Sequence, residues 1–130
     1  MPSTFSVHWD SPQILTARRS GLMHVEDFQA YLAEVTQAID AAPASWAIIV
    51  DTSDAPPQSE EVSQSLNYLQ KYVIERGAAF VAVVTSKTVT ALQQRRLLTG
   101  PGMHETGTVG FYDDFASARA AAEEVLAGAH

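Results

Sequence analysis

Polar side chains follow three predicted strands, and these are the residues whose types and spacing could do chemistry. The segment Asp51-Thr52-Ser53-Asp54 comes directly after an apolar strand, Ser86 follows the next strand, and Tyr112 follows the last. Because ligands in open α/β sheets bind beyond the carboxyl ends of the strands, we expect an interaction or ligand edge there. Its candidate members are Asp51, Ser53, Asp54, Ser86 and Tyr112. The alternative is plain helix capping and turn formation, for which Ser, Thr and Asp are also preferred.

Three known acidic sites do not fit the spacing at this edge. A metal-binding adhesion loop needs Asp-x-Ser-x-Ser, but Ala55 stands where its third ligand would be. A phosphoaspartate receiver needs an acidic pair after its first strand, whereas Asp10 is alone there. A phosphatase loop of the Asp-x-Asp type would need an acid in place of Ser53.

The other residues that could catalyse a reaction are not accompanied by the groups they would need. His8 and Asp10 share one strand face and are the nearest approach to a metal-ligand pair, but no His-x-x-x-His spacing exists. His104 lacks a nucleophile and an orienting carboxylate. The chain also has no cysteine, no Gly-x-Ser-x-Gly elbow and no phosphate-binding glycine loop. We therefore expect no enzyme activity, no metal and no cofactor.

The composition of the chain limits the kinds of partner and the cellular location that we expect. The net charge is −7 with only eight Lys and Arg residues, so nucleic acid, which is bound mainly through basic side chains, is not an expected partner. No apolar stretch approaches the roughly 18 residues that span a bilayer. The first ten residues lack the basic start and apolar run of a secretion signal. We expect a cytoplasmic location.

Hydrophobic periodicity predicts the strands that must position these residues. Phe5, Val7 and Trp9 alternate with polar residues, and a turn at Ser11-Pro12 leads into a second strand from Gln13 to Arg19, which together predict a hairpin. Continuous apolar runs predict strands that are buried on both faces. These runs are Trp46–Val50 and Ala78–Val84, and a fifth strand is expected at Thr106–Phe111.

Helical spacing of apolar residues predicts four helices between and after these strands. Ser59 is the expected N-cap of the second helix, with Glu60 and Glu61 in its first turn. A third helix is expected to begin at Ser86 or Thr88, and Asp113 to cap the last. The residues expected to face inward are Val25, Phe28, Leu32, Val35 and Ile39 in the first helix, Val62, Leu66, Leu69 and Val73 in the second, and Phe115, Ala118, Ala122 and Val125 in the last.

The predicted order of strands and helices is β-β-α-β-α-β-α-β-α. This order predicts an α/β fold in which a mixed five-stranded sheet is flanked by four helices. We expect a single domain over residues 1–130. This order, the strand Ala47–Asp51 and the closing segment Gly110–Ala120 resemble the STAS domain superfamily, in particular its SpoIIAA-like group. The resemblance spans roughly Phe5 to Leu126. The fold of that group is also compared with the lipid-binding Sec14 (CRAL-TRIO) domain.

The resemblance implies a regulatory role and a modification site. In phospho-switched members, a serine at the start of the second helix accepts phosphate, and the free N–H groups of a helix N-terminus suit that charge. Ser59 is the corresponding candidate phosphoacceptor. The Asp-Ser-Ser-Gly pattern of those members is absent, since Asp54–Glu61 carries two prolines and places Ser59 before two acids. Plain N-capping is therefore the favoured role of Ser59.

Two functions remain as hypotheses from the sequence. The first is a non-catalytic regulatory module of STAS type that binds a protein partner through the second helix and the segment before it. The alternative is a domain that binds a small apolar ligand or lipid, as the Sec14 likeness implies. Either could form a homodimer through an exposed strand edge. The apolar pocket of the second hypothesis would be lined by Leu66, Leu69, Val73, Leu97 and Met103.

Overall fold

The computed structural model describes residues 4–54, 58–85 and 109–128. These ranges contain, in chain order, β1 (Thr4–Ser11), β2 (Ile14–Ser20), α1 (Val25–Asp40), β3 (Trp46–Asp54), α2 (Glu60–Glu75), β4 (Ala78–Val84), β5 (Val109–Tyr112) and α4 (Phe115–Ala127). The helix predicted to start at Ser86 or Thr88 lies outside the described residues. The mixed five-stranded α/β sheet is confirmed, and the described ranges hold three of the expected helices.

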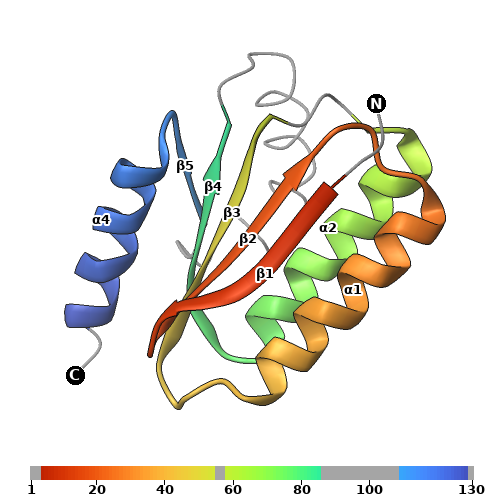
Figure 1. Ribbon diagram of the computed structural model, residues 1–130. Helices are drawn as coiled ribbons and strands as arrows, with labels where there is room; N and C mark the ends of the chain where they lie inside the picture. Colours follow the sequence, from red (N-terminus) through yellow and green to blue (C-terminus); the bar gives the residue numbers. More distant parts are fainter. Residues whose placement is uncertain (1–3, 55–57, 86–108, 129–130) are drawn as a thin grey trace.

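The five strands lie side by side in the order in which they occur in the chain (Figure 1). β1 and β2 pair antiparallel, and β2, β3, β4 and β5 pair parallel. The short Pro12-Gln13 connection and the alternation of β1 produce the opening hairpin, as the pattern predicts. Four parallel carboxyl ends therefore meet at one edge of the sheet.

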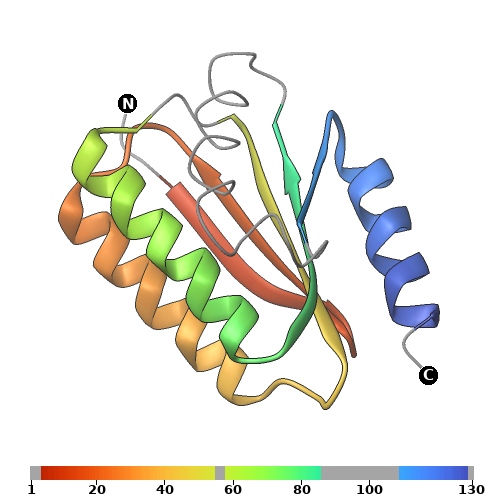
Figure 2. The same cartoon turned by 180° about the vertical axis from the view of Figure 1, so that it is seen from behind.

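The helices cover the two faces of the sheet unequally (Figures 1 and 2). α1 and α2 lie on one face, where the larger core contains Leu15, Ile48 and Val81 of the central strands. α4 lies on the other face, where Ala118 and Ala122 pack on the sheet. Since alanine side chains are small, α4 can approach the strands closely. α4 packs mainly on β3, β4 and β5, which leaves the outer part of that face to polar side chains of β1.

Two strands differ in extent from the prediction. β3 continues through Asp54, because Asp51 and Asp54 still pair with Arg18 and Ser20 of β2, although the register shifts between these two pairs. The polar residues predicted to follow the strand are therefore its last residues. Tyr112 likewise ends β5, where it pairs with Val84, and does not follow it.

Two helix details also differ from the prediction. Val25 is 40% exposed and not inward-facing, because it is the first residue of α1, at the end of the helix layer. The N-cap of α4 is Asp114 and not Asp113, since the Asp114 carboxylate accepts a 2.7 Å hydrogen bond from the backbone N–H of Ser117. Two adjacent aspartates made the cap ambiguous by one residue in the sequence.

The Asp114 cap predicts a pH dependence of stability. The Ser117 N–H lowers the pKa of Asp114 below its ordinary value, because it stabilises the ionised form. A carboxyl group with a lowered folded-state pKa stabilises the fold above the unfolded pKa of about 3.9, and this stability is lost as pH falls through the folded pKa. The midpoint of urea unfolding should therefore fall less from pH 7 to pH 3 in Asp114→Asn than in the wild type, because asparagine caps the helix without titrating. Asp113→Asn is the matched control, and an equal fall in both variants would contradict the cap assignment.

Candidate functional site

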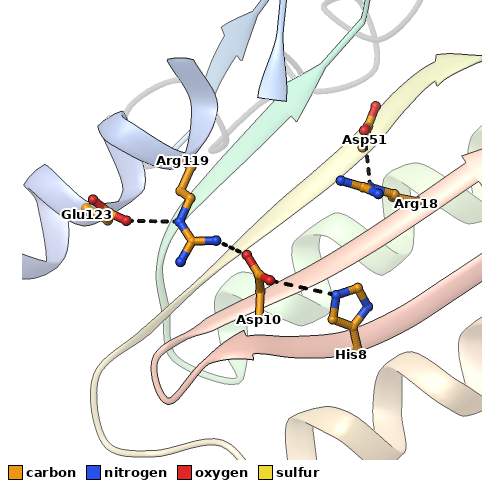
Figure 3. A network of polar contacts seen from close by, with 6 residues as sticks. All are labelled: His8, Asp10, Arg18, Asp51, Arg119 and Glu123. Atoms are coloured by element: carbon orange, nitrogen blue, oxygen red, sulfur yellow. Dashed lines mark hydrogen bonds and ion pairs between the residues drawn. The ribbon is translucent and has the colours of Figure 1, made fainter. Parts of the chain in front are cut away.

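The carboxyl edge of the sheet brings three of the predicted site residues together. The Asp51 carboxylate lies 3.4 Å from Nε of Arg18 (Figure 3). The same carboxylate accepts two hydrogen bonds from Ser53, one from the backbone N–H at 3.1 Å and one from the hydroxyl at 2.7 Å. Asp54 is exposed at the end of β3, and its carbonyl oxygen accepts a hydrogen bond from the Gly21 N–H. The Asp51 carboxylate thus balances Arg18 and fixes the end of β3.

A polar pocket of about 270 Å³ lies at this edge, between the start of β1 and the ends of β2 and β3. Its walls include Ser6, Arg18, Arg19, Asp51, Ser53 and Asp54. Tyr112 is not part of this pocket. It lies on β5 with its ring edge-on to Phe80 at 6.4 Å, and burial raises its pKa. Ser86 lies outside the described residues.

Sequence reasoning missed Arg19, which it assigned to the end of a strand. Arg19 is only 6% exposed. Its guanidinium lies 5.7 Å from the centre of the Tyr31 ring of α1. A signal was available in the sequence, because adjacent residues of a strand point to opposite faces. Of the pair Arg18-Arg19, one must therefore face the side that α1 and α2 cover.

Ser59 begins α2 as predicted. Its hydroxyl accepts a 3.2 Å hydrogen bond from the Val62 N–H, and the side chain is exposed. The preceding residue joins this end of α2 to the loop before α1. Gln58 Oε1 accepts from the Met23 N–H at 2.7 Å, and Gln58 Nε2 donates to the Gly21 carbonyl at 3.3 Å. The start of α2 and the entry to α1 therefore form one surface.

The cap predicts the effect of a single substitution. Ser59→Ala should lower the free energy of unfolding by about 1 kcal/mol, because the Val62 N–H loses its acceptor. The free energy of unfolding of Ser59→Asp should stay within about a few tenths of a kcal/mol of the wild-type value, since aspartate caps equally well. Urea denaturation measures both, with Gln37→Ala on the exposed side of α1 as the control. Equal stability of Ser59→Ala and the wild type would show that the bond contributes nothing.

An apolar groove of about 380 Å³ runs between α1 and α2. α1 contributes Phe28, Leu32 and Thr36 to its walls, and α2 contributes Ser65, Tyr68, Leu69 and Tyr72. The ring of Tyr68 is 74% exposed at its rim. The groove therefore offers an apolar, solvent-facing surface on the helix layer.

The predicted apolar pocket is only partly represented in the described residues. Leu69 lines the groove between α1 and α2. Val73 is buried in the core beneath the helices, and Leu66 packs against that core. Leu97 and Met103 lie outside the described residues. A pocket formed by all five residues therefore stays a prediction.

The pair His8 and Asp10 belongs to a structural network (Figure 3). Asp10 pairs with Arg119 of α4 and lies 4.0 Å from His8, and Arg119 also pairs with Glu123 at 3.0 Å. These contacts attach α4 to the hairpin. No group of three or more possible metal ligands occurs among the residues that the structure describes. Among the helices in those residues, none has the length and apolar character to cross a membrane.

Solved structures of other proteins have a fold similar to that of this chain. An anti-sigma factor antagonist from Mycobacterium paratuberculosis is 18% identical with a TM-score of 0.65, covering 94% of this chain and 95% of that one. An uncharacterised protein with a SpoIIAA-like fold from Shewanella loihica is 13% identical with a TM-score of 0.63, and the match covers 92% of this chain and 93% of that one. The phosphorylated form of the Bacillus cell fate determinant SpoIIAA is 12% identical with a TM-score of 0.59, and the match covers 91% of this chain and 99% of that one.

Sequence comparisons add no relative. No protein-family model matches the chain, and no curated protein matches it. The agreement in structure extends over nine-tenths or more of each chain. The fold of this chain is therefore the SpoIIAA-like fold that anti-sigma factor antagonists have, as the resemblance in its sequence implied.

Proposed function

We propose that this chain is a non-catalytic regulatory module that binds a protein partner through the outer surface of α1 and α2. One observation carries the proposal. The large apolar side chains exposed in the described residues are Leu22 (45%), Val25 (40%) and Tyr68 (74%). Leu22 and Val25 lie at the entry to α1, and Tyr68 lies on α2 at the rim of the groove. Tyr68 lies beside the apolar groove between α1 and α2, and exposed apolar surface of this kind is a candidate interaction site.

The charge of the chain indicates what kind of partner fits. The net charge is −7, and Glu60 and Glu61 are exposed in the first turn of α2. A partner segment with an apolar anchor for the groove and basic residues around it would be complementary to this surface. Its association should be slower at high salt, because salt screens the attraction between exposed charges.

The fold supports a protein partner, since two of the similar structures are anti-sigma factor antagonists by name. One similar structure is a phosphorylated form. In this chain, Ser59 is exposed at the corresponding helix start, but Glu60 and Glu61 would oppose a phosphate there. The proposal therefore assigns Ser59 the role of N-cap, and mass spectrometry of the protein from its native cells tests for phosphate on it.

Affinity capture with a matched pair of baits tests the proposal. The wild type and Leu32→Arg, which places a charge in the groove, are immobilised at equal density and exposed to lysate of the native cells. A specific partner should be retained by the wild type and lost with Leu32→Arg, and its binding should weaken between 50 and 500 mM salt. If no protein distinguishes the two baits, or if the retained protein is indifferent to the groove, the proposal fails.

The second candidate function is binding of a small apolar ligand in the same groove. The observation that favours it is the lining, since Phe28, Leu32 and Leu69 form an apolar wall. The volume of about 380 Å³ lies near the lower end of the range for small-molecule sites, roughly 300 to 1,000 Å³.

Fluorescence of an alkyl probe separates this candidate from the first. A fatty acid with a fluorescent tag should bind the wild type with saturation, and Leu32→Trp should abolish saturation because the larger ring fills the groove. Ala116→Gln is the control, because Ala116 is exposed and belongs to α4, the helix on the opposite face of the sheet from α1 and α2 (Figure 2). Linear, non-saturating fluorescence with the wild type would exclude a defined apolar site.

A further inference from the structure

The outer side of β1 is an unpaired strand edge. β1 stands first in the order of the sheet and pairs with β2 on one side only (Figure 1). Within the residues that the structure describes, no backbone hydrogen bond joins its other side to another segment. β1 has eight residues, whereas β5, the strand at the opposite edge, has four. A long row of free backbone N–H and C=O groups can pair with a further strand.

β1 lacks most of the features that block such pairing. Natural edge strands are protected by lysine or proline, or by an irregularity of the strand. β1 contains neither lysine nor proline, and its register with β2 shifts only after Trp9, so Thr4–Trp9 is regular. Phe5, Val7 and Trp9 are only partly buried where they pack against the larger core. Apolar surface therefore continues to the open edge, where a further strand would cover it.

We propose that this edge pairs antiparallel with β1 of a second copy of the chain, about a twofold axis at Val7. In this register Val7 lies opposite Val7 of the second copy, and Phe5 lies opposite Trp9 of the second copy. On the other face, Ser6 lies opposite His8 of the second copy. Pairs of aromatic and branched apolar side chains directly across an antiparallel ladder stabilise it. The two copies form one continuous sheet, with α1 and α2 of both on the same face.

The sequence of β1 favours this register over its neighbours. An axis at His8 would set two histidines opposite each other, and an axis at Ser6 would shorten the pairing to Thr4–His8. A shift by a single residue would place the apolar face of one copy beside the polar face of the other. In the proposed register Asp10 lies opposite Thr4, so no like charges meet, although each copy has a net charge of −7. The pairing does not use α2 and is independent of the partner-binding surface.

Single cysteines test the register, because the chain has no cysteine of its own. Only a residue on the twofold axis meets its own copy. Val7→Cys should therefore form a disulfide-linked dimer under mild oxidation, since opposite Cα atoms of an antiparallel pair lie about 4.5 to 5.5 Å apart, within disulfide reach. Ser6→Cys and His8→Cys, at exposed positions, should link slowly alone and rapidly when mixed. Linkage of Val7→Cys no faster than of Ala116→Cys on α4, or of the mixture no faster than of its components, would overturn the proposal.

Sedimentation equilibrium tests the dimer without a crosslink. The average mass of the wild type should rise toward twice the 14.0 kDa of one chain between 10 and 500 µM. Val7→Lys places two like charges opposite each other on the axis and should stay at the mass of one chain. Ala116→Lys is the control and should behave as the wild type. A wild type that stays monomeric, or a Val7→Lys that still dimerises, would contradict the pairing. If Val7→Lys does not fold, the mixture of Ser6→Cys and His8→Cys decides.

Discussion

Tyr68→Ala is expected to weaken binding of the protein partner by about 30-fold or more. Tyrosine is enriched among the side chains that dominate interfaces, and truncating such a residue costs about 2 kcal/mol or more. Tyr68 is 74% exposed beside the groove between α1 and α2, so a partner can bury nearly the whole ring. In the free protein, the same exposure means that the ring contributes little to the fold.

Two measurements check this expectation. Isothermal titration with the purified partner gives the affinity of the wild type, Tyr68→Ala and the control Ala116→Gln on α4. Urea denaturation should place the stability of Tyr68→Ala within about 0.5 kcal/mol of the wild type, as for most surface substitutions. An affinity change below threefold would remove Tyr68 from the interface.

Trp46→Ala is expected to lower the free energy of unfolding by about 3 to 5 kcal/mol, the usual cost of removing a large aromatic side chain from a core. Trp46 is 1% exposed at the start of β3 and packs edge-on against Trp9 with 5.9 Å between ring centres. Its removal therefore opens a cavity between the hairpin and the central strands. Urea midpoints with an unchanged denaturant slope measure the loss.

The contrast with Tyr68 provides the internal control for this prediction. Both changes remove an aromatic ring, but one ring is 1% exposed and the other 74%. If the two variants lost equal stability, the core assignment of Trp46 would be wrong. A loss below about 1 kcal/mol for Trp46→Ala would have the same meaning.

The strands and the helix starts were predictable because they depend on local patterns. Alternation in Phe5, Val7 and Trp9 gives one partly buried face, and the apolar run from Ala78 gives a strand covered on both faces. Ser59 ahead of two glutamates accepts from the Val62 N–H, one of the free N–H groups at the start of α2. Each of these features depends on neighbours within a few positions of the chain.

The site could be predicted only in part because it depends on contacts between distant segments. Asp51 was correctly placed at the carboxyl edge, but its pairing with Arg18 follows from the register of β2 and β3. The burial of Arg19 follows from the position of Tyr31 on α1. The groove depends on how far α1 and α2 stand apart, which side-chain spacing within either helix does not determine.

Site-specific photo-crosslinking tests most directly whether the α1/α2 surface binds a protein partner. The crosslinking amino acid benzoylphenylalanine is introduced at position 68 on α2 and, in a second protein, at position 116 on α4. In native cells, irradiation should link one defined protein to position 68, and the same protein should be absent at position 116. The absence of a crosslink at position 68, or the same products at both positions, would contradict the assignment of α1 and α2 as the binding surface.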